Sequence, residues 1–224
     1  MNRIQVPPDP LAELRRTPKQ ERSRALVGTI LDATDGLLAD GHHPAELTTT
    51  KIAAAAGVSV GAIYQYFADT GSIVAAVAAR HIDASSALMD TAVESIGADP
   101  DPVGTLVDLF AARYRGEPGY RALWFGPHLN SRIQAADRAG KETIADGIRR
   151  AFATAQPGRK AVPLSEQQAR AAVFAVDSLL QEAFRRDPAG DPGLLEEAKA
   201  MMRAYLPEAA PEPTPTTEGG RNGR

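Results

Sequence analysis

The 224-residue sequence predicts an all-α fold of about nine helices, with a small N-terminal domain of three helices and a larger C-terminal helical domain. In most segments apolar residues recur every three or four positions, the spacing that gathers them on one face of a helix. Capping residues, Gly and Pro separate these segments. No alternating strand-helix pattern accompanies them, and a chain of this length can form both domains.

The first helix is expected to begin at Thr17. The run Thr17-Pro18-Lys19-Gln20 places a capping residue, a Pro at the first helical position and a Gln three residues after the cap. Gly41 ends the segment. The preceding residues, 1–16, are rich in Pro and polar groups, and we expect them to be disordered. The apolar positions of this helix are Leu26, Ile30, Ala33 and Leu37.

Residues 48–67 predict two short helices joined by a tight turn. Thr48 is a suitable N-cap for a helix over 49–56, because its hydroxyl can accept a bond from an unpaired backbone N–H. Gly57 suits the left-handed conformation that ends a helix, and Ser59 can cap a second one. The expected contacts between the two helices come from Ile52, Ala53, Ala56, Val58, Ile63 and Phe67, with Ile63 and Phe67 one turn apart on the second helix.

The outward face of the second helix carries small and hydrogen-bonding groups, which fit the major groove of DNA. Gln65 can pair with adenine, helped by Ser59, while Val60 or Ala62 can contact thymine methyl groups and Gly61 lies beside Gln65 on this face. A plain helical hairpin is the alternative. No Lys or Arg occurs between Lys51 and Arg80. Phosphates are therefore expected to be held by helix N-termini, Lys51 and the hydroxyls of Thr48, Tyr64, Tyr66 and Thr70.

A basic cluster precedes and begins the first helix. Its members either contact phosphates or the minor groove, or form a solvated helix end. The net charge of −3 argues against indiscriminate nucleic-acid binding by the whole chain. The cluster comprises Arg15, Arg16, Lys19, Arg22 and Arg24.

A long helix is predicted from about Thr70 to Ile96, with Asp69 as its cap. At roughly 1.5 Å per residue it is about 40 Å long and can touch both domains. We therefore divide the chain into a DNA-binding domain, 17–83, and a second domain, 84–206. After a turn at 97–102, helices are expected over 103–115, 118–125 and about 128–155.

Aromatic residues concentrate in the second domain and can line a ligand cavity, although aromatic side chains at helical spacing are more often plain core. A nearby His can hydrogen-bond a ligand. The candidate ligand-binding residues are Phe110, Tyr114, Tyr120, Trp124, Phe125 and His128.

Two amphipathic helices are expected near the C-terminus, at about 165–186 and 191–206, the first opened by a capping box at Ser165. Their apolar stripes either pair with a second copy or cover their own core. From Pro207 onward the chain should be disordered. The stripes are Ala169, Val173, Val176, Leu180 and Ala183 on one helix, and Leu194, Ala198, Met201 and Tyr205 on the other.

Gly57-Val58-Ser59-Val60-Gly61 spells the G-x-S-x-G of a hydrolase nucleophile elbow. An elbow follows a buried strand, whereas the preceding KIAAAA favours a helix, so we expect no catalytic residue and no enzyme.

The four His form no metal set, and the sequence has no Cys. We expect no metal and no cofactor. No apolar run is long enough for a membrane span or a signal peptide, so a cytoplasmic protein is expected.

Residues 48–67 resemble the DNA-binding domain of the tetracycline-repressor (TetR) family of bacterial transcription regulators. The family pattern is a Thr-led helix, Ile-Ala, Ala-Gly-Val-Ser and Tyr-x-x-Phe. The chain departs from the pattern at Thr70, where family members usually carry a Lys that contacts phosphate. The resemblance covers roughly residues 20–80, and its motif appears here as Thr48, Ile52-Ala53, Ala56-Gly57-Val58-Ser59 and Tyr64 with Phe67.

The resemblance implies a homodimeric repressor that a small-molecule effector releases from a palindromic double-stranded DNA operator. It implies that the last two helices of each copy form the dimer interface and that the long fourth helix transmits ligand binding. Two recognition helices would then lie about 34 Å apart, in successive major grooves. A constitutive DNA-binding regulator without an effector is the alternative.

Overall fold

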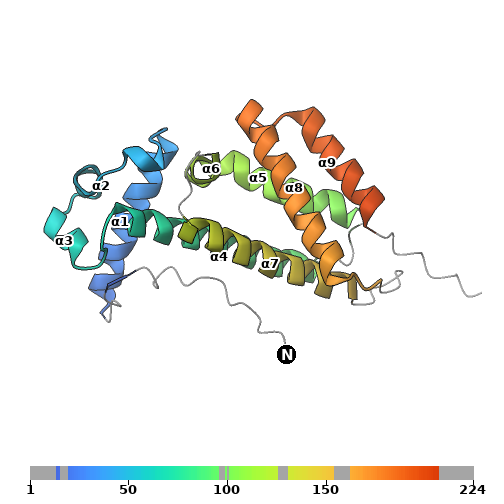
Figure 1. The fold of residues 1–224 in the computed structure, drawn as a ribbon, viewed down its shortest axis with the longest axis horizontal. Coiled ribbons are helices and arrows are strands. Elements are labelled where there is room, and N and C mark those ends of the chain that lie inside the picture. The colour runs from blue at the N-terminus through green and yellow to red at the C-terminus, as the bar shows by residue number, and fades with distance from the viewer. Residues whose placement is uncertain are drawn as a thin grey trace, which may run out of the picture.

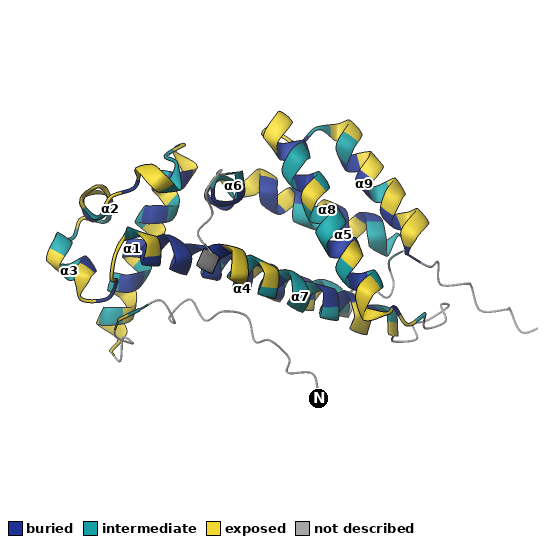
Figure 2. Ribbon diagram, in the orientation of Figure 1, coloured by how far each residue is buried: buried dark blue, intermediate teal, exposed yellow. Residues whose placement is uncertain are grey.

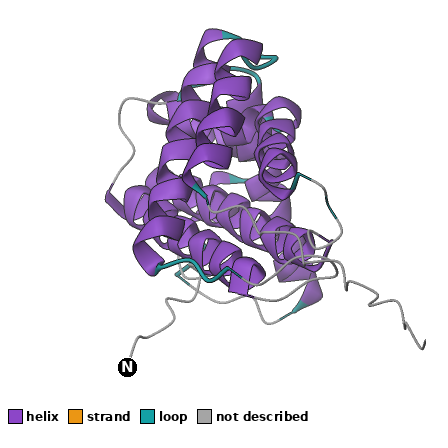
Figure 3. Cartoon of the chain, turned by 90° about the vertical axis from the view of Figure 1, so that its right-hand side faces the viewer, coloured by secondary structure: helices purple, strands orange, loops and turns teal. Residues whose placement is uncertain are grey.

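The computed structural model describes residues 14–15, 20–95, 99, 101–125, 131–153 and 162–206. Within these ranges the chain forms nine α-helices, one short 3-10 helix (η2, Pro44–Glu46) and no strand, which confirms the predicted all-α fold (Figures 1 and 3). Most of the expected N-terminal arm and the whole expected tail, 207–224, lie outside the described residues.

The small domain consists of α1 (Glu21–Ala39), α2 (Thr49–Ala56), α3 (Val60–Tyr64) and the first turns of α4 (Thr70–Ser95). Helix α1 begins later than the sequence predicts: Gln20 occupies the N-cap position without a side-chain bond, and Thr17 lies outside the described residues. The side chains that hold the three helices together are almost fully buried: Ile30, Leu38, Ile52, Ile63 and Phe67.

Local capping fixes the turn between α2 and α3 as predicted. Thr48 Oγ1 accepts from the Lys51 N–H at 3.2 Å, and Ser59 Oγ accepts from the Ala62 N–H at 3.1 Å. Gly57 has φ of 67°, the left-handed region that costs a side-chain-bearing residue energy. One expectation was wrong: α3 ends at Tyr64, so Phe67 lies after the helix rather than on it. Phe67 still reaches the core because the chain turns inward there, leaving its side chain 0% exposed.

Helix α4 joins the two domains. Its N-terminus is capped by Asp69, whose Oδ1 accepts from the Ser72 N–H at 2.7 Å. From Ser72 to Ala79 every residue is buried between the small domain and the body, and α4 continues alongside α7 (Ser131–Ala153), as Figures 1 and 2 show. The predicted domain boundary at residue 83 falls inside this helix, so α4 belongs to both domains.

The remaining helices are α5 (Pro102–Gly116), α6 (Pro118–Phe125), α8 (Glu166–Arg186) and α9 (Pro192–Tyr205). The predicted capping box at Ser165 is present, with Ser165 and Gln168 bonded reciprocally. Helix α6 is short and lies against α1, so that one apolar cluster runs from the small domain into the body. The fold therefore places the α2–α3 pair at one end and a helical body at the other, with α4 and α6 between them (Figure 1).

Candidate nucleic-acid interface and ligand cavity

The outer surface of the α2–α3 pair is exposed where the sequence predicts DNA contact. Ser59, Gly61 and Gln65 are exposed, and Val60 and Ala62 are half-buried. Tyr64 is 46% exposed, and its hydroxyl lies 3.4 Å from Thr49 Oγ1. This surface combines hydrogen-bonding and small apolar groups on a rigid scaffold, the combination that base recognition needs.

The candidate phosphate-binding residues differ in accessibility. Thr48 and Lys51 are exposed, and Lys51 Nζ donates to the Glu46 carbonyl at 3.2 Å. Thr70 is half-buried as the first residue of α4. Tyr66 departs from expectation, since it packs into the core at 9% exposure because the chain turns inward after α3. Of the basic cluster, Arg15, Arg22 and Arg24 are exposed, while Arg16 and Lys19 lie outside the described residues.

The body contains a partly open cavity of about 90 Å³ between α4, α5, α6, α7, α8 and the end of α9. Since one water needs roughly 10–15 Å³ of such space, the cavity has room for several waters or a small organic molecule. Four of the aromatic candidates line it: Phe110, Tyr114, Tyr120 and Trp124. Phe125 is not among the lining residues but stacks on the Tyr114 ring with centroids 6.1 Å apart, and His128 lies outside the described residues.

Sequence reasoning missed a charged group in this cavity. Lys141 on α7 lies 2.6 Å from Asp137 Oδ2 and 2.7 Å from Asp177 Oδ2 on α8. Asp177 also accepts from the Tyr114 hydroxyl at 3.1 Å and from Gln181 at 2.7 Å. The signal was present in the sequence as a single Asp inside the apolar run Val173–Leu180, because a charge on a buried helix face needs a partner.

For Lys141 and for Asp137, burial and the opposite charges nearby shift the pKa in opposite directions. Burial lowers the pKa of Lys141, but Asp177 and Asp137 raise it by more, so the ammonium stays protonated at neutral pH. Burial raises the pKa of Asp137 above its ordinary value, although Lys141 opposes the shift. Burial and the charge of Asp177 raise the pKa of Tyr120 to about 12, so its hydroxyl remains neutral.

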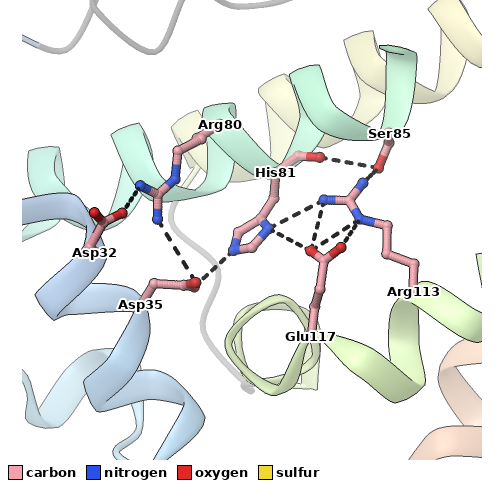
Figure 4. A network of polar contacts seen from close by, with 7 residues as sticks. All are labelled: Asp32, Asp35, Arg80, His81, Ser85, Arg113 and Glu117. Atoms are coloured by element: carbon pink, nitrogen blue, oxygen red, sulfur yellow. Dashed lines mark hydrogen bonds and ion pairs between the residues drawn. The ribbon is translucent and has the colours of Figure 1, made fainter. Parts of the chain in front are cut away.

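A second polar network joins the cavity wall to the small domain (Figure 4). His81 on α4 lies 2.8 Å through Nε2 from Asp35 Oδ1 on α1, and 3.2 Å through Nδ1 from Arg113 Nη2 on α5. Arg113 also bonds Glu117, with Nε 3.1 Å from Oε1, and Ser85. Beside them Arg80 pairs with Asp32 at 2.5 Å. These contacts connect α1, α4 and α5 with Glu117, the residue between α5 and α6; His81, Ser85 and Arg113 are buried, whereas Glu117 is half-buried and Asp32 is exposed.

Arg113 is the point where network and cavity meet. Its guanidinium lies 4.4 Å from the centroid of the Tyr120 ring and bonds Ser85, and both Tyr120 and Ser85 line the cavity. At the other end, Asp35 lies against α6: a Cβ added to Gly119 would come within 2.2 Å of Asp35 Oδ1. Only Gly permits this approach of α6 to α1. A change in the cavity wall therefore has a short, packed route to α1.

The geometry around Ser59 does not match a hydrolase elbow. Helix α2 precedes it, and its hydroxyl caps α3 by accepting from Ala62. Among the described residues no three metal-ligating side chains form a group. Within the same part of the chain, no helix has the length and apolar character that crossing a membrane requires.

The chain is similar to known regulators in both domains. The family model described as "Bacterial regulatory proteins, tetR family" matches residues 30–77, and the model described as "Tetracyclin repressor-like, C-terminal domain" matches residues 99–210. No curated protein matches the sequence.

Solved structures share the fold. A TetR-family transcriptional regulator from Streptomyces coelicolor is 26% identical, with 83% of this chain and 97% of that chain covered and a TM-score of 0.60. FadR from Bacillus subtilis, in complex with stearoyl-CoA, is 19% identical, with coverage of 80% and 97% and a TM-score of 0.60. The SmeT–triclosan complex is 20% identical, with coverage of 85% and 99% and a TM-score of 0.54.

The network makes a prediction about pH and stability. Burial raises the pKa of Asp35, but the hydrogen bond from His81 and the charges of His81, Arg80 and Arg113 together bring it below the ordinary 3.8. The carboxylate therefore stabilises the fold above pH 3.8, and this contribution is lost as the pH falls through the lower folded pKa. Asp35→Asn should lower the free energy of unfolding by about 1 kcal/mol at pH 7, and the difference from wild type should shrink below pH 3.8.

Urea denaturation followed by circular dichroism between pH 7 and pH 3 measures this difference. Asp40→Asn, at the exposed end of α1, is the control and should change the free energy of unfolding by less than about 0.5 kcal/mol. An Asp35→Asn variant as stable as wild type at pH 7 would contradict the prediction.

Proposed function

Because the chain belongs to the tetracycline-repressor family of bacterial transcription regulators, we propose that it is a repressor that binds a palindromic operator and is released by a small molecule. The observation that carries this proposal is the contiguous route from the cavity, through Arg113 and His81, to Asp35 on α1. A constitutive regulator has no use for a cavity connected in this way, so the ligand-responsive alternative is favoured. We place its action in the cytoplasm, where the operator lies, and assign it no enzymatic activity.

We assign base recognition to the outward face of α3 and the residue that follows it. Gln65 is exposed and has the amide that pairs with adenine in the major groove. Val60 and Ala62 offer apolar contact to thymine methyls, with Ser59 and Gly61 beside them. Thr48, Lys51, Tyr64 and Thr70 are assigned to phosphates, with helix N-termini supplying further N–H groups. Tyr66 is left out because it is buried.

Release requires that the effector bind the DNA-incompetent conformation more tightly. A ligand in the cavity contacts Tyr120 and Ser85, both of which touch Arg113. A shift of Arg113 changes its bonds to His81 and Glu117, and His81 holds Asp35. Since α1 carries the α2–α3 pair through their common core, the effector can reorient the DNA-binding surface without touching it. The distance between the two α3 helices of a dimer is the property that such a movement alters.

We propose that the dimer forms through the outer surfaces of α8 and α9. The α8 stripe predicted from the sequence lies mostly inside the protein's own core, with Ala169, Leu180 and Ala183 at 2% exposure or less. The α9 stripe behaves differently. Its Ala198 is buried, whereas Met201 and Tyr205, one turn apart, are 39% and 44% exposed. On α9, which has exposed positions along its length (Figure 2), these two side chains rather than the α8 stripe offer apolar surface to a second copy.

The proposed DNA contacts are tested by substituting Gln65 and Lys51 after the operator has been selected from random DNA. Gln65→Ala should weaken operator binding by about 10- to 100-fold, corresponding to 1–3 kcal/mol, and leave binding to random DNA nearly unchanged. Lys51→Met should weaken both to the same degree, because a phosphate contact carries no sequence information. Fluorescence anisotropy at fixed salt measures all four affinities. Absence of any preferred duplex sequence would overturn the proposed function.

The proposed interface is tested by placing a charge on it. Met201→Glu buries an unpaired carboxylate in the dimer, so sedimentation equilibrium should show at least a tenfold weaker dimer while circular dichroism shows unchanged helix content. Thr29→Glu adds the same charge on the exposed side of α1, outside the interface, and should leave the dimer intact. A Met201→Glu variant that dimerises like wild type would exclude this part of α9 from the interface.

A further inference from the structure

The charges that line the cavity do not balance. Among the described residues of its wall, the charged side chains are one cation, Lys141, and two carboxylates, Asp137 and Asp177. Asp177 is fully engaged, because its two oxygens accept from Tyr114, Gln181 and Lys141. Asp137 has Lys141 as its partner within the cavity, and Lys141 is shared with Asp177. The group as a whole carries a net charge of −1 when both carboxylates are ionised.

The neighbouring cations do not remove this excess. Arg113 stands behind the Tyr120 ring and is engaged with Glu117, whose carboxylate is 3.1 Å from its Nε. Arg138, next to Asp137 on α7, is exposed to solvent, and its charge opposes the rise in the pKa of Asp137 only in part. Burial raises the pKa of Asp137 because an ionised carboxylate here lacks sufficient compensation. A positive charge brought in by a ligand supplies that compensation.

The rest of the wall suits the apolar body of such a ligand. Aliphatic side chains such as Met89, Leu106 and Ile148 face the cavity together with the aromatic rings. Aromatic faces attract cations, and Tyr114, Tyr120 and Trp124 form a continuous group of ring contacts with centroids 4.9 and 5.8 Å apart. Trp124 lines the cavity, and its buried indole N–H has no hydrogen-bond partner among the described residues.

We propose that the cavity binds an apolar molecule bearing one protonated amine, with the ammonium group against Asp137 and the hydrocarbon body along the aromatic wall. This assignment deepens the proposed function by naming the chemical class of its effector. Carboxylic acids are disfavoured, because a second anion would meet an existing carboxylate excess in an apolar surrounding. Trp124 is the single tryptophan of the chain and lines the cavity, which makes its emission a probe of the cavity.

Three probes with one skeleton test the sign of the charge: 4-phenylbutylamine, 4-phenylbutanol and 4-phenylbutyrate. Calorimetry on the full-length protein without DNA measures their affinities, and Trp124 emission reports whether they occupy the cavity. The amine should bind at least about tenfold more tightly than the alcohol, the size expected of a charge-assisted hydrogen bond, and the acid should bind most weakly. Equal affinities, tightest binding of the acid, or no binding of the amine at millimolar concentration would each overturn the inference.

Matched variants locate the charge that is responsible. Asp137→Asn leaves Lys141 paired with Asp177 and should abolish the tenfold preference for the amine over the alcohol. Asp146→Asn, on the same helix but outside the cavity wall, should preserve it. Persistence of the full preference in Asp137→Asn would overturn the assignment to Asp137.

The same samples separate this inference from the proposed function. Operator release by the amine is measured in a second experiment with labelled DNA. Amine binding without release supports the ligand class and contradicts the regulatory role. Release by molecules that do not compete with the amine supports the regulatory role and contradicts the ligand class.

Discussion

The contacts of Arg113 with His81, Glu117 and Ser85 are the interaction on which the arrangement of the two domains depends. Arg113 is 6% exposed, so its guanidinium has lost most of its water and is held by protein groups on α4 and at the start of α6. Burying such a group is costly unless its bonds are formed, and removing one partner leaves the others unsatisfied. The positions of α4, α5 and α6 are therefore coupled to one another, and His81 extends that coupling to α1.

Neither the cavity nor the buried charges around Lys141 add much to the stability of the fold. An unfilled interior forgoes packing energy, since each missing contact in a core weakens the fold. The buried group of Lys141, Asp137 and Asp177 likewise adds little net stability, because the desolvation of these three charges offsets much of their attraction. Both features are explained if the body is built to bind a molecule and change its packing. A fully packed apolar body would be more stable but could not change its packing when a ligand binds.

Features encoded within a few residues could be predicted from the sequence, and those that depend on distant contacts could not. The structure confirms the predicted caps at Thr48, Ser59 and Ser165 and the left-handed conformation of Gly57. Each of these features involves neighbours only three or four positions away. The early end of α3 and the burial of Tyr66 depend on packing against α1 and α4, which is not encoded in the neighbouring residues. The Asp35–His81 and Tyr114–Asp177 contacts join residues 46 and 63 positions apart, which helical periodicity cannot indicate.

We propose that Arg113 carries the coupling between the cavity and the DNA-binding surface, and this coupling can be measured as a free energy. A molecule that releases the operator is titrated into wild type and Arg113→Met, each free and operator-bound. For each protein, the ligand's affinity for the free form divided by its affinity for the operator-bound form is the coupling ratio. Linkage requires this ratio to equal the factor by which the ligand weakens DNA binding, typically about 5- to 150-fold. We predict a ratio in this range for wild type and a ratio near one for Arg113→Met. An unchanged ratio in a variant that still binds both DNA and ligand would contradict the claim.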